Sequence, residues 1–399
     1  MNELTKIIYK GGPISRSELS TVLGVDEIEL DFILMLEDEA KYKSSQLVKN
    51  DGRFRNINNP SPIVRKIQRK IKNRIFSLIS WPVYLYGSIP AENENSHDFI
   101  ACASRHCRAK SLVKLDVEDF FDNISQELVQ KIFENVMFFD KDAADTLAKI
   151  CCLDGRVPQG GITSSYLATL ALYSIEERLY FRLKNKKLVY TRYVDDITIS
   201  SKDRDFSFDM IIKIIEKELN SLDLPLNKDK VEICRFGLEP LKVHNVRVDS
   251  KLPRYDQADV KRIKAMVHRL ELLVKKPNYR THYFYRQDYN SCMGFINKLG
   301  RVEHPSYFKL KNKLKKIFPL PNNADVTYVR NSIDNLKELK LNSKNAFVYQ
   351  KKFYKIQYRI ALLKKHPKGI YNAKAVELNR ELQLLRLNDE LERKTESGN

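Results

Sequence analysis

The stretch KLVYTRYVDDITIS, residues 187–200, decides how this chain is interpreted. Strand-forming residues run directly into two adjacent aspartates, Asp195 and Asp196, and a second strand-like segment follows at once. Hairpin turns usually carry Asn-Gly or Asp-Gly, because these residues tolerate positive φ. Two like charges side by side at such a turn repel each other unless a cation lies between them. The stretch therefore predicts a bound cation.

A second motif supplies a third carboxylate. In SLVKLDVEDFFDNIS (residues 111–125) a short apolar strand is expected to end at Asp116, where the chain turns into a helix. Mg²⁺ prefers oxygen ligands and shares its shell with phosphates. Asp116 beside Asp195 would bridge two Mg²⁺ ions roughly 3.5–4 Å apart, one activating a 3′-hydroxyl and the other stabilising the leaving pyrophosphate. Mn²⁺ could substitute. Each motif alone is explained equally well as a plain turn or a helix cap.

Composition limits the partners. The chain has 399 residues, with 70 Lys and Arg against 51 Asp and Glu, which gives a formal net charge of +19. An excess of this size favours a polyanionic partner, above all nucleic acid. A membrane surface is the weaker alternative. No apolar run approaches the roughly 18 residues of a membrane-spanning helix, and we expect no membrane partner. Six cysteines without a CxxC pair predict reduced thiols in a cytoplasmic protein.

Taken together, the motifs are similar to those of bacterial retron-type reverse transcriptases. YTRYVDDITIS resembles the catalytic hairpin of that family, and LDVEDFF resembles the palm motif that carries its first metal ligand. The resemblance covers about residues 45–318. It implies that Asp116, Asp195 and Asp196 bind metal, and that the chain is an RNA-directed DNA polymerase acting on an RNA template and dNTPs.

Two further motifs of the resemblance concern the incoming nucleotide. NDGRFRNINNP resembles the fingers motif whose arginine holds the triphosphate, which implies Arg55 with Arg53 assisting. Phe121 occupies the position of the family's steric gate, five residues past Asp116. A bulky ring there would exclude a 2′-hydroxyl and select dNTPs. The alternative for Phe121 is an ordinary core residue.

Two more motifs complete the resemblance. VPQGGITSSYLATLAL implies that Gln159 contacts the incoming nucleotide, while Gly160 and Gly161 let backbone approach the base pair. LPLNKDKVEI resembles the motif whose lysine lies near the leaving pyrophosphate. That lysine is Lys230, with Lys228 as the alternative.

The resemblance also implies the fold class, an α+β right-hand polymerase with fingers, a palm built on an antiparallel sheet, and a helical thumb. We expect a helical cap before it and a helical extension after it, with a linker at the prolines of FPLPNNAD. The expected divisions are 1–45 for the N-terminal helical region, 46–110 for the fingers, 111–250 for the palm with a fingers insertion, 251–318 for the thumb and 319–399 for the extension.

Three departures from the family bear on function. Ser165 stands where the family has Pro, AENENSHDFIACAS replaces an Asn-Ala-x-x-His signature, and VHN (residues 243–245) replaces Val-Thr-Gly. They favour a defence-associated, non-retron branch that copies a dedicated non-coding RNA in response to phage. The alternative is a retron enzyme making branched msDNA. An RNA-directed RNA polymerase is disfavoured by Phe121 and by the lack of Gly-Asp-Asp, and an inactive RNA-binding scaffold by the three intact ligand positions.

The C-terminal helix AKAVELNRELQLLRLNDELER (residues 373–393) carries a leucine stripe. Two interpretations remain open for it. The stripe packs on the protein's own body, or it forms a homo-oligomer. Its members are Leu378, Leu382, Leu384, Leu385, Leu387 and Leu391.

Overall fold

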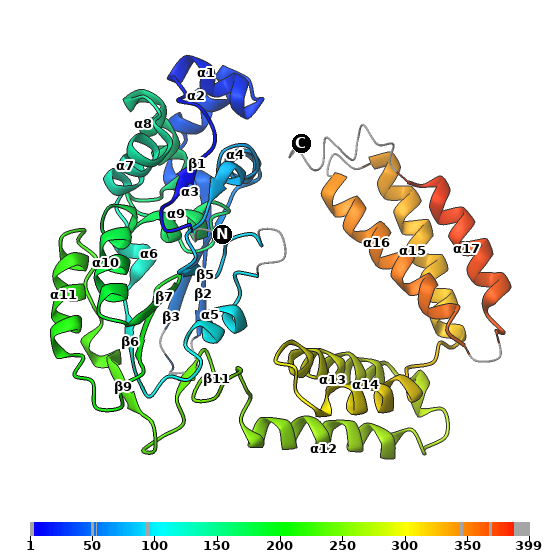
Figure 1. Ribbon diagram of the computed structural model, residues 1–399. Coiled ribbons are helices and arrows are strands. Elements are labelled where there is room, and N and C mark those ends of the chain that lie inside the picture. Colours follow the sequence, from blue (N-terminus) through cyan, green and yellow to red (C-terminus); the bar gives the residue numbers. More distant parts are fainter. Residues whose placement is uncertain are drawn as a thin grey trace. The chain divides into compact units, whose positions relative to one another are not determined.

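The computed structural model describes most of the chain, namely residues 4–48, 52, 54–91, 96–342, 346–366 and 369–386. The chain divides into two compact units, Met1–Arg254 and Tyr255–Asn399 (Figure 1). The first unit combines helices and strands, and the described residues of the second form helices, so the predicted α+β class is confirmed. All six cysteines are unpaired thiols, as predicted.

A five-stranded sheet forms the centre of the first unit, in the order β5-β7-β8-β6-β9. Its strands are β5 (Leu85–Tyr86), β6 (Ser111–Asp116), β7 (Val189–Tyr193), β8 (Asp196–Ser201) and β9 (Glu232–Arg235). The predicted antiparallel pairing is observed throughout, except that β5 runs parallel to β7 at one edge.

Helices and short strands surround this sheet. The helices are α1 (Arg16–Leu23), α2 (Glu27–Met35), α3 (Asp38–Lys41), α4 (Pro62–Arg74), α5 (Phe99–Arg105), α6 (Phe120–Asn123), α7 (Gln126–Met137), α8 (Lys141–Cys151), α9 (Ser164–Leu170), α10 (Tyr173–Asn185) and α11 (Asp209–Asn220). The remaining elements are the strands β1 (Ile8–Tyr9), β2 (Tyr42–Val48), β3 (Phe54–Pro60), β4 (Ile79–Ser80), β10 (Lys242–Val243) and β11 (Val246–Arg247), and the 3-10 turns η1 (Phe76–Leu78) and η2 (Lys228–Lys230).

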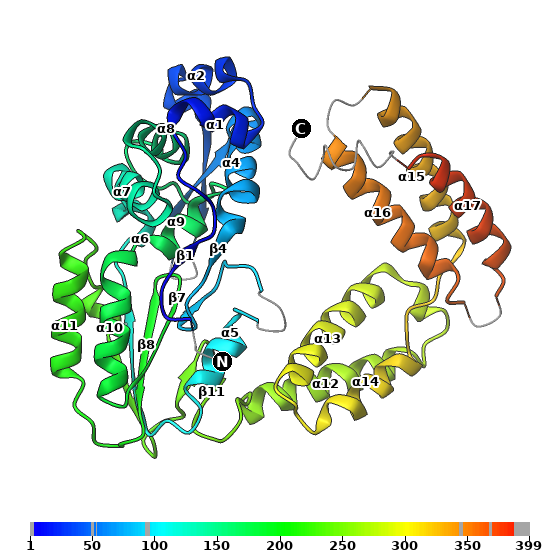
Figure 2. The same cartoon turned by 45° about the horizontal axis from the view of Figure 1, so that its top comes forward.

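The two faces of the sheet are covered by different elements. Ile197 and Ile199 of β8 belong to the main hydrophobic core, to which α10 and α11 also contribute. Ser200, the residue after Ile199, points to the opposite face and hydrogen-bonds His106 at the end of α5. Figure 2 shows α10 and α11 together on one side of the sheet and α5 on the other. This alternation fixes which residues of β8 are inside.

The N-terminal region is helical as predicted, although it begins with a strand. β1 pairs antiparallel with β4. α1 ends at Gly24, which has a φ of +59° and separates α1 from α2. β2 and β3 form an antiparallel hairpin, with Tyr42 opposite Pro60 and Val48 opposite Phe54.

The second unit contains two hydrophobic cores. The first is formed by α12 (Gln257–Leu273), α13 (Tyr283–Arg301) and α14 (Ser306–Lys316), with the 3-10 turn η3 (Tyr279–Thr281) before α13. The second is formed by α15 (Asn323–Asn342), α16 (Ala346–Leu363) and α17 (Asn372–Leu384). The two cores fall within the ranges expected for the thumb and the extension. Among the helices described, none is both long and apolar enough to cross a bilayer.

The expected linker between these two cores makes defined contacts. Arg280 donates to the carbonyl oxygen of Phe318 through Nε and Nη2, at 2.8 and 2.6 Å. Arg286 donates to both carboxylate oxygens of Asp325, at 2.7 and 2.8 Å. These bonds fix the path of the chain into α15.

The leucine stripe of the C-terminal helix packs within its own unit. Leu378 and Leu382 are fully buried in the core of α15–α17, and Leu385 packs against that core. Leu384 is 77% exposed. Leu387 and Leu391 lie outside the described residues. The structure therefore supports the interpretation in which the stripe packs on the protein itself.

Candidate active site

The two adjacent aspartates lie where β7 turns into β8. Val194 and Asp195 form the turn, and Asp196 begins β8 and pairs with Tyr193. Val194 has a φ of +60°, a left-handed conformation that a β-branched residue rarely adopts. Such strain costs about 1–3 kcal/mol and persists only where surrounding contacts hold the backbone.

The side chain of Arg192 supplies such contacts. It is fully buried, and its Nη1 donates to the carbonyl oxygen of Val194 at 2.9 Å. Its Nε and Nη2 donate to the two carboxylate oxygens of Glu176 on α10, each at 2.6 Å. Nη2 also donates to the carbonyl oxygen of Thr169 in α9, at 2.7 Å. One guanidinium therefore connects the aspartate turn to two helices.

Strand register brings the third carboxylate to the same place. β6 and β8 pair so that Asp116 lies directly opposite Asp196. Loss of hydration, together with the negative charges of Asp195 and Asp116, raises the pKa of Asp196 to about 6. Burial and the charge of Asp116 also raise the pKa of Asp195, against the opposing charges of Lys230 and Arg55. Each of these carboxylates makes ionisation of its neighbours less favourable. A divalent cation placed between them would stabilise their ionised forms.

Lys230 lies beside the first aspartate. Its Nζ is 2.8 Å from Oδ2 of Asp116. The backbone N–H of Asn227 donates to the backbone carbonyl of Asp116 at 2.8 Å. This hydrogen bond fixes the loop before η2 against the end of β6. Lys228 instead pairs with Glu216, also at 2.8 Å. Of the two candidate lysines, Lys230 is thus the one that contacts the aspartates.

The predicted nucleotide-binding loop packs against the β2–β3 hairpin. The amide of Asn58 donates to the carbonyl oxygen of Gln159 at 2.7 Å. Gly160 has a φ of +119°, and a Cβ at this position would lie 2.7 Å from the carbonyl oxygen of Asn58. A Cβ on Gly161 would overlap the hydroxyl of Ser164. Close packing within the protein therefore favours glycine at both positions, in addition to the predicted approach of the backbone to a base pair.

Arg55 and Phe121 occupy different surroundings. Arg55 is exposed on β3, and its charge is close enough to lower the pKa of Asp195. Phe121 is half-buried in α6, packs against the main core, and has its ring centroid 6.1 Å from that of Phe120. Part of its ring remains accessible. Arg53, the predicted assistant of Arg55, lies outside the described residues.

His244 also belongs to the site, although no motif predicts it. It lies in the turn between β10 and β11, within the VHN segment, with a φ of +49°. Its ring packs on that of Tyr193, with centroids 4.6 Å apart, and its Nδ1 lies 3.9 Å from Oδ2 of Asp196. Burial lowers the pKa of His244 to about 4. The ring is therefore neutral at pH 7 and packs against the turn without forming an ion pair.

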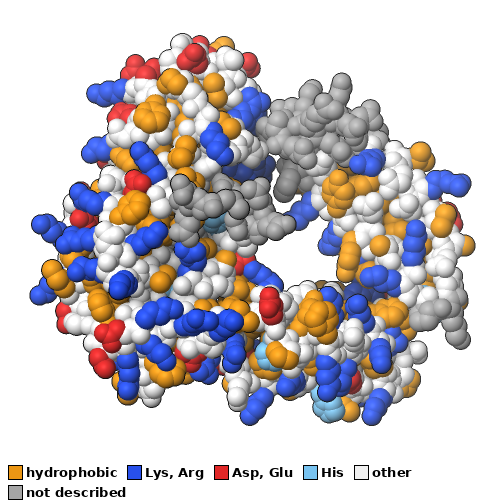
Figure 3. Space-filling view, viewed as in Figure 1, with side chains coloured by type: hydrophobic (Ala, Val, Ile, Leu, Met, Phe, Trp, Pro, Cys, Tyr) orange, Lys and Arg blue, Asp and Glu red, His pale blue; other side chains and the backbone are white. Residues whose placement is uncertain are grey.

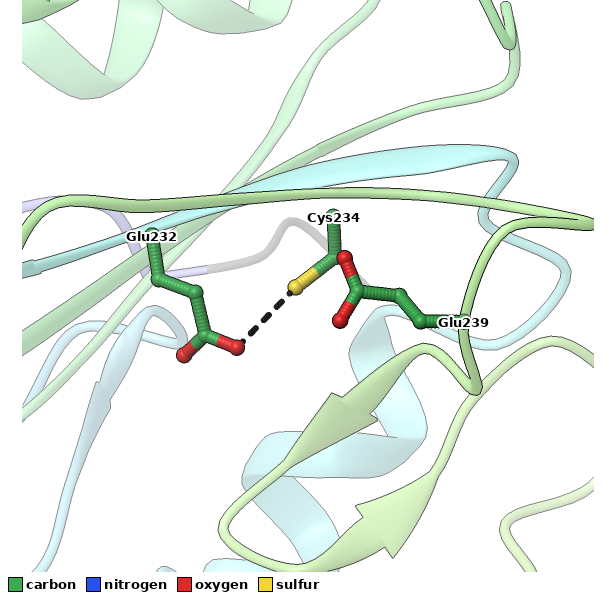
Figure 4. Close-up of side chains that lie close together, drawn as sticks. All are labelled: Glu232, Cys234 and Glu239. Atoms are coloured by element: carbon green, nitrogen blue, oxygen red, sulfur yellow. Dashed lines mark hydrogen bonds between the residues drawn. The ribbon is translucent and has the colours of Figure 1, made fainter.

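Among the described residues, Glu232, Cys234 and Glu239 have potential ligand atoms within 4.8 Å of one another (Figure 4). Cys234 donates to Glu232 at 3.3 Å, and Lys114 donates to the same carboxylate at 3.0 Å. Loss of hydration raises the pKa of Cys234 to about 12, so the thiol keeps its proton. The protonated thiol of Cys234 donates to the Glu232 carboxylate, whose charge is already paired with Lys114. These groups therefore need no metal ion, and we assign no metal here.

Comparison with known proteins identifies the class to which this fold and site belong. The family model of reverse transcriptases, described as RNA-dependent DNA polymerases, matches residues 47–276, which is more than half of the chain. The chain belongs to the reverse transcriptase family.

Individual relatives narrow the class. The Retron Ec48 reverse transcriptase of Escherichia coli is 40% identical over 371 residues, covering 91% of each chain. The Retron Se72 reverse transcriptase of Salmonella heidelberg is 31% identical, covering 79% of this chain and 83% of the other. A solved telomerase from Candida albicans is a distant match, with a TM-score of 0.41 at 13% identity, covering 86% of this chain and 63% of that one. The predicted bacterial retron-type reverse transcriptase, an RNA-directed DNA polymerase with the right-hand fold, is confirmed.

Proposed function

We propose that Asp116, Asp195 and Asp196 hold two Mg²⁺ ions and that nucleotidyl transfer takes place there. The observation that carries this proposal is the β6–β8 register, which sets Asp116 opposite Asp196 with Asp195 adjacent in the turn. The donor set fits, because Mg²⁺ prefers carboxylate oxygens, and the raised pKa values of Asp195 and Asp196 support a nearby cation. When bound, the ions would stabilise negative charge on the attacking and leaving oxygens.

The side chains around the aspartates would bind and orient the nucleotide. Arg55 would pair with triphosphate oxygens, and Lys230, beside Asp116, would neutralise the leaving pyrophosphate. Gln159 would contact the incoming dNTP. The accessible part of the Phe121 ring would exclude a 2′-hydroxyl, so that DNA is the product.

Replacing Asp195 by Asn tests the metal assignment. We expect Asp195→Asn to abolish dNTP incorporation while folding is kept, because the substitution removes a ligand charge without leaving a cavity. Calorimetric titration with Mn²⁺ should show weaker binding at the same time. Asp205→Asn, at an exposed loop position after β8, is the matched control and should behave as the wild type. Incorporation at the wild-type rate in Asp195→Asn would contradict the assignment.

We further propose that the template is a dedicated non-coding RNA and that the reaction serves antiviral defence in the cytoplasm. Two observations support different versions of this proposal, a retron enzyme and a non-retron enzyme. The relatives above are retron reverse transcriptases, which favours the alternative of a branched msDNA product. The VHN segment, where the family resemblance expects Val-Thr-Gly, favours the non-retron branch.

Sequencing the nucleic acid that copurifies with the protein separates these versions. Samples are compared before and after ribonuclease and debranching treatment. A branch between RNA and DNA would establish the retron alternative. Unbranched DNA copied from one abundant RNA would establish the non-retron version, and a mixture of cellular RNAs would contradict a dedicated template.

A further inference from the structure

The helices α15, α16 and α17 distribute their charges unequally. α15 contains three acidic and three basic residues, and α17 contains two of each. α16 contains four basic residues and no acidic residue. α16, with the sequence AFVYQKKFYKIQYRIALL, is therefore the cationic helix of this bundle. The other two helices each carry equal numbers of acidic and basic residues.

Several charges of α15 and α17 are paired at the surface, within one helix or between the two helices. Lys337 lies 3.1 Å from Asp334 and 3.6 Å from Glu381, and Arg330 lies 3.5 Å from Glu377. Lys374 and Glu377 form another pair at 2.8 Å. These contacts leave little net charge on the sides of α15 and α17 that face each other.

The lysines of α16 differ from these paired charges. Within the part of the chain that the structure describes, Lys351, Lys352 and Lys355 are exposed and form no ion pair. The fourth cation, Arg359, lies 3.8 Å from Asp325 and over the ring of Tyr328. Three positive charges on one helix are thus available to a partner.

Two tyrosines are interleaved with these lysines. Tyr354 and Tyr358 are 51% and 53% exposed. At 100° per residue, both lie on the side of α16 opposite the buried Phe353, Ile356 and Ile360, together with Lys351 and Lys355. Figure 3 shows Lys and Arg side chains interspersed with hydrophobic ones over the visible face of this bundle. We call Lys351, Tyr354, Lys355 and Tyr358 the outer face of α16.

We propose that the outer face of α16 binds single-stranded RNA, in addition to the RNA held at the polymerase site. Exposed aromatic rings stack on bases, and lysines neutralise the phosphates between them. Rings four residues apart on a helix are about 6 Å apart along its axis, whereas stacked bases repeat every 3.4 Å or so. Bases must separate to reach both rings, which a single strand allows and a duplex does not.

Charge and activity select RNA among the possible partners. A face with free cations and no acidic residue is complementary to a polyanion rather than to a typical protein surface. The polymerase reaction begins from an RNA that extends beyond the nucleotides being copied. Template RNA outside the polymerase site is therefore the single strand that this enzyme holds from the start of each reaction.

The test measures the affinity of the full chain for an unstructured RNA long enough to extend beyond the polymerase site. Tyr354→Ala with Tyr358→Ala should weaken binding about tenfold or more, because both stacking rings are lost. Tyr354→Phe with Tyr358→Phe is the matched control and should bind within about twofold of the wild type, since stacking needs the ring and not the hydroxyl.

A second pair of variants tests the charges. Lys351→Gln with Lys355→Gln should lower the slope of log affinity against log salt by about 1.4, since each phosphate contact on a single strand contributes about 0.7. Lys337→Gln with Lys374→Gln removes the same charge from paired positions and should leave the slope unchanged. Thermal melting of each variant reports whether the bundle still folds.

Each outcome decides for or against the proposal. RNA binding equal to the wild type in both the alanine and the glutamine variants would show that the face is merely solvated. Because stacking and phosphate contacts need no 2′-hydroxyl, the same variants should also lose affinity for single-stranded DNA, and an unchanged affinity for it would contradict this mode of binding. Incorporation on a short primer–template should be unchanged in all four variants. Its loss would place α16 in the polymerase reaction itself and overturn a separate site, whereas failure of the metal assignment would appear only in the aspartate variants.

Discussion

The aspartate turn and the outer face of α16 use charged residues in opposite ways. At the turn, Arg192 and Glu176 are buried and paired, and they fix the backbone at Val194. On α16, the lysines are exposed and unpaired among the described residues. Buried charges of fixed geometry suit a reaction that depends on the positions of a few atoms. Free charges on long side chains suit a flexible polyanion of any sequence.

The largest effect is expected from breaking the buried pair. Glu176→Gln leaves the Arg192 charge uncompensated, so the free energy of unfolding should fall by about 3–5 kcal/mol. We expect kcat to fall about 100-fold as well, because a displaced turn misplaces Asp195 and Asp196. Denaturant titration and single-nucleotide incorporation measure the two effects.

Two further variants separate stability from positioning. Arg192→Met with Glu176→Leu removes both charges and should recover much of the stability. kcat should stay low, because the donor to the Val194 carbonyl is gone. Glu218→Gln is the control at a less buried ion pair, since Glu218, which is 20% exposed, pairs at 2.7 Å with Arg178, whose side chain is 71% exposed. It should cost about 0–1 kcal/mol. Recovery of full activity in the double variant would refute the positioning role.

A smaller effect, confined to the other region, is expected from Leu378→Ala. Leu378 is fully buried between α15, α16 and α17, so its truncation should destabilise that bundle by about 2–5 kcal/mol. Hydrogen exchange of α15–α17 should accelerate, while kcat on a short primer–template stays the same. Leu384→Ala, at an exposed position, is the control. A matching fall in kcat would show that the two regions are coupled.

Gly160→Ala tests the contact between the loop and the β2–β3 hairpin. The new Cβ would collide with the Asn58 carbonyl, and we expect kcat/KM to fall about tenfold, which is about 1.4 kcal/mol. Gly155→Ala is the control for a positive φ without a collision, because Gly155 has a φ of +69° and no atom within 4 Å of its Cβ position, although this φ strains an alanine less than the +119° of Gly160. Equal losses in the two variants would mean that strain alone is responsible.

The smallest expected effect is the pH dependence of the metal-free protein. The folded-state pKa of Asp196 is raised from 3.8 to about 6, so the folded state binds a proton more readily than the unfolded state between these values. Stability from this group is therefore present below the lower value and is lost as the pH rises through the higher one. Asp196→Asn should gain stability relative to the wild type over this rise, as measured by denaturant titration. Added Mg²⁺ should reduce the difference, and a constant difference would contradict the raised pKa.

The sequence predicts those parts of the site that follow from patterns of neighbouring residues. Asp116 follows an apolar strand, Asp195 and Asp196 follow another, and the structure pairs these strands. β2 and β3 pair on either side of the sequence Asp51-Gly52, a dipeptide typical of hairpin turns. Such features depend on residues close together in the chain, so periodicity and turn chemistry are enough to place them. The roles assigned to the three aspartates, Arg55, Phe121, Gln159 and Lys230 remain predictions.

Contacts between distant segments could not be predicted in the same way. Glu176 is separated from Arg192 by a helix end and a strand, and no motif indicates that their side chains meet. The approach of Asn58 to Gly160 also depends on how two loops pack. The leucines of α17 have the same spacing whether they meet another copy or their own bundle, so only the packed structure separates those interpretations.

The β6–β8 register also has a consequence for quality control in the cell. Asp116 lies opposite Asp196 only in the register that buries Ile197 and Ile199, because a slip of one residue would turn every β8 side chain to the other face. A molecule in which the aspartates are misaligned by such a slip would therefore also expose part of its hydrophobic core. Chaperones and proteases recognise such copies as unfolded, so the enzymes that survive in the cell are enriched in correctly assembled centres.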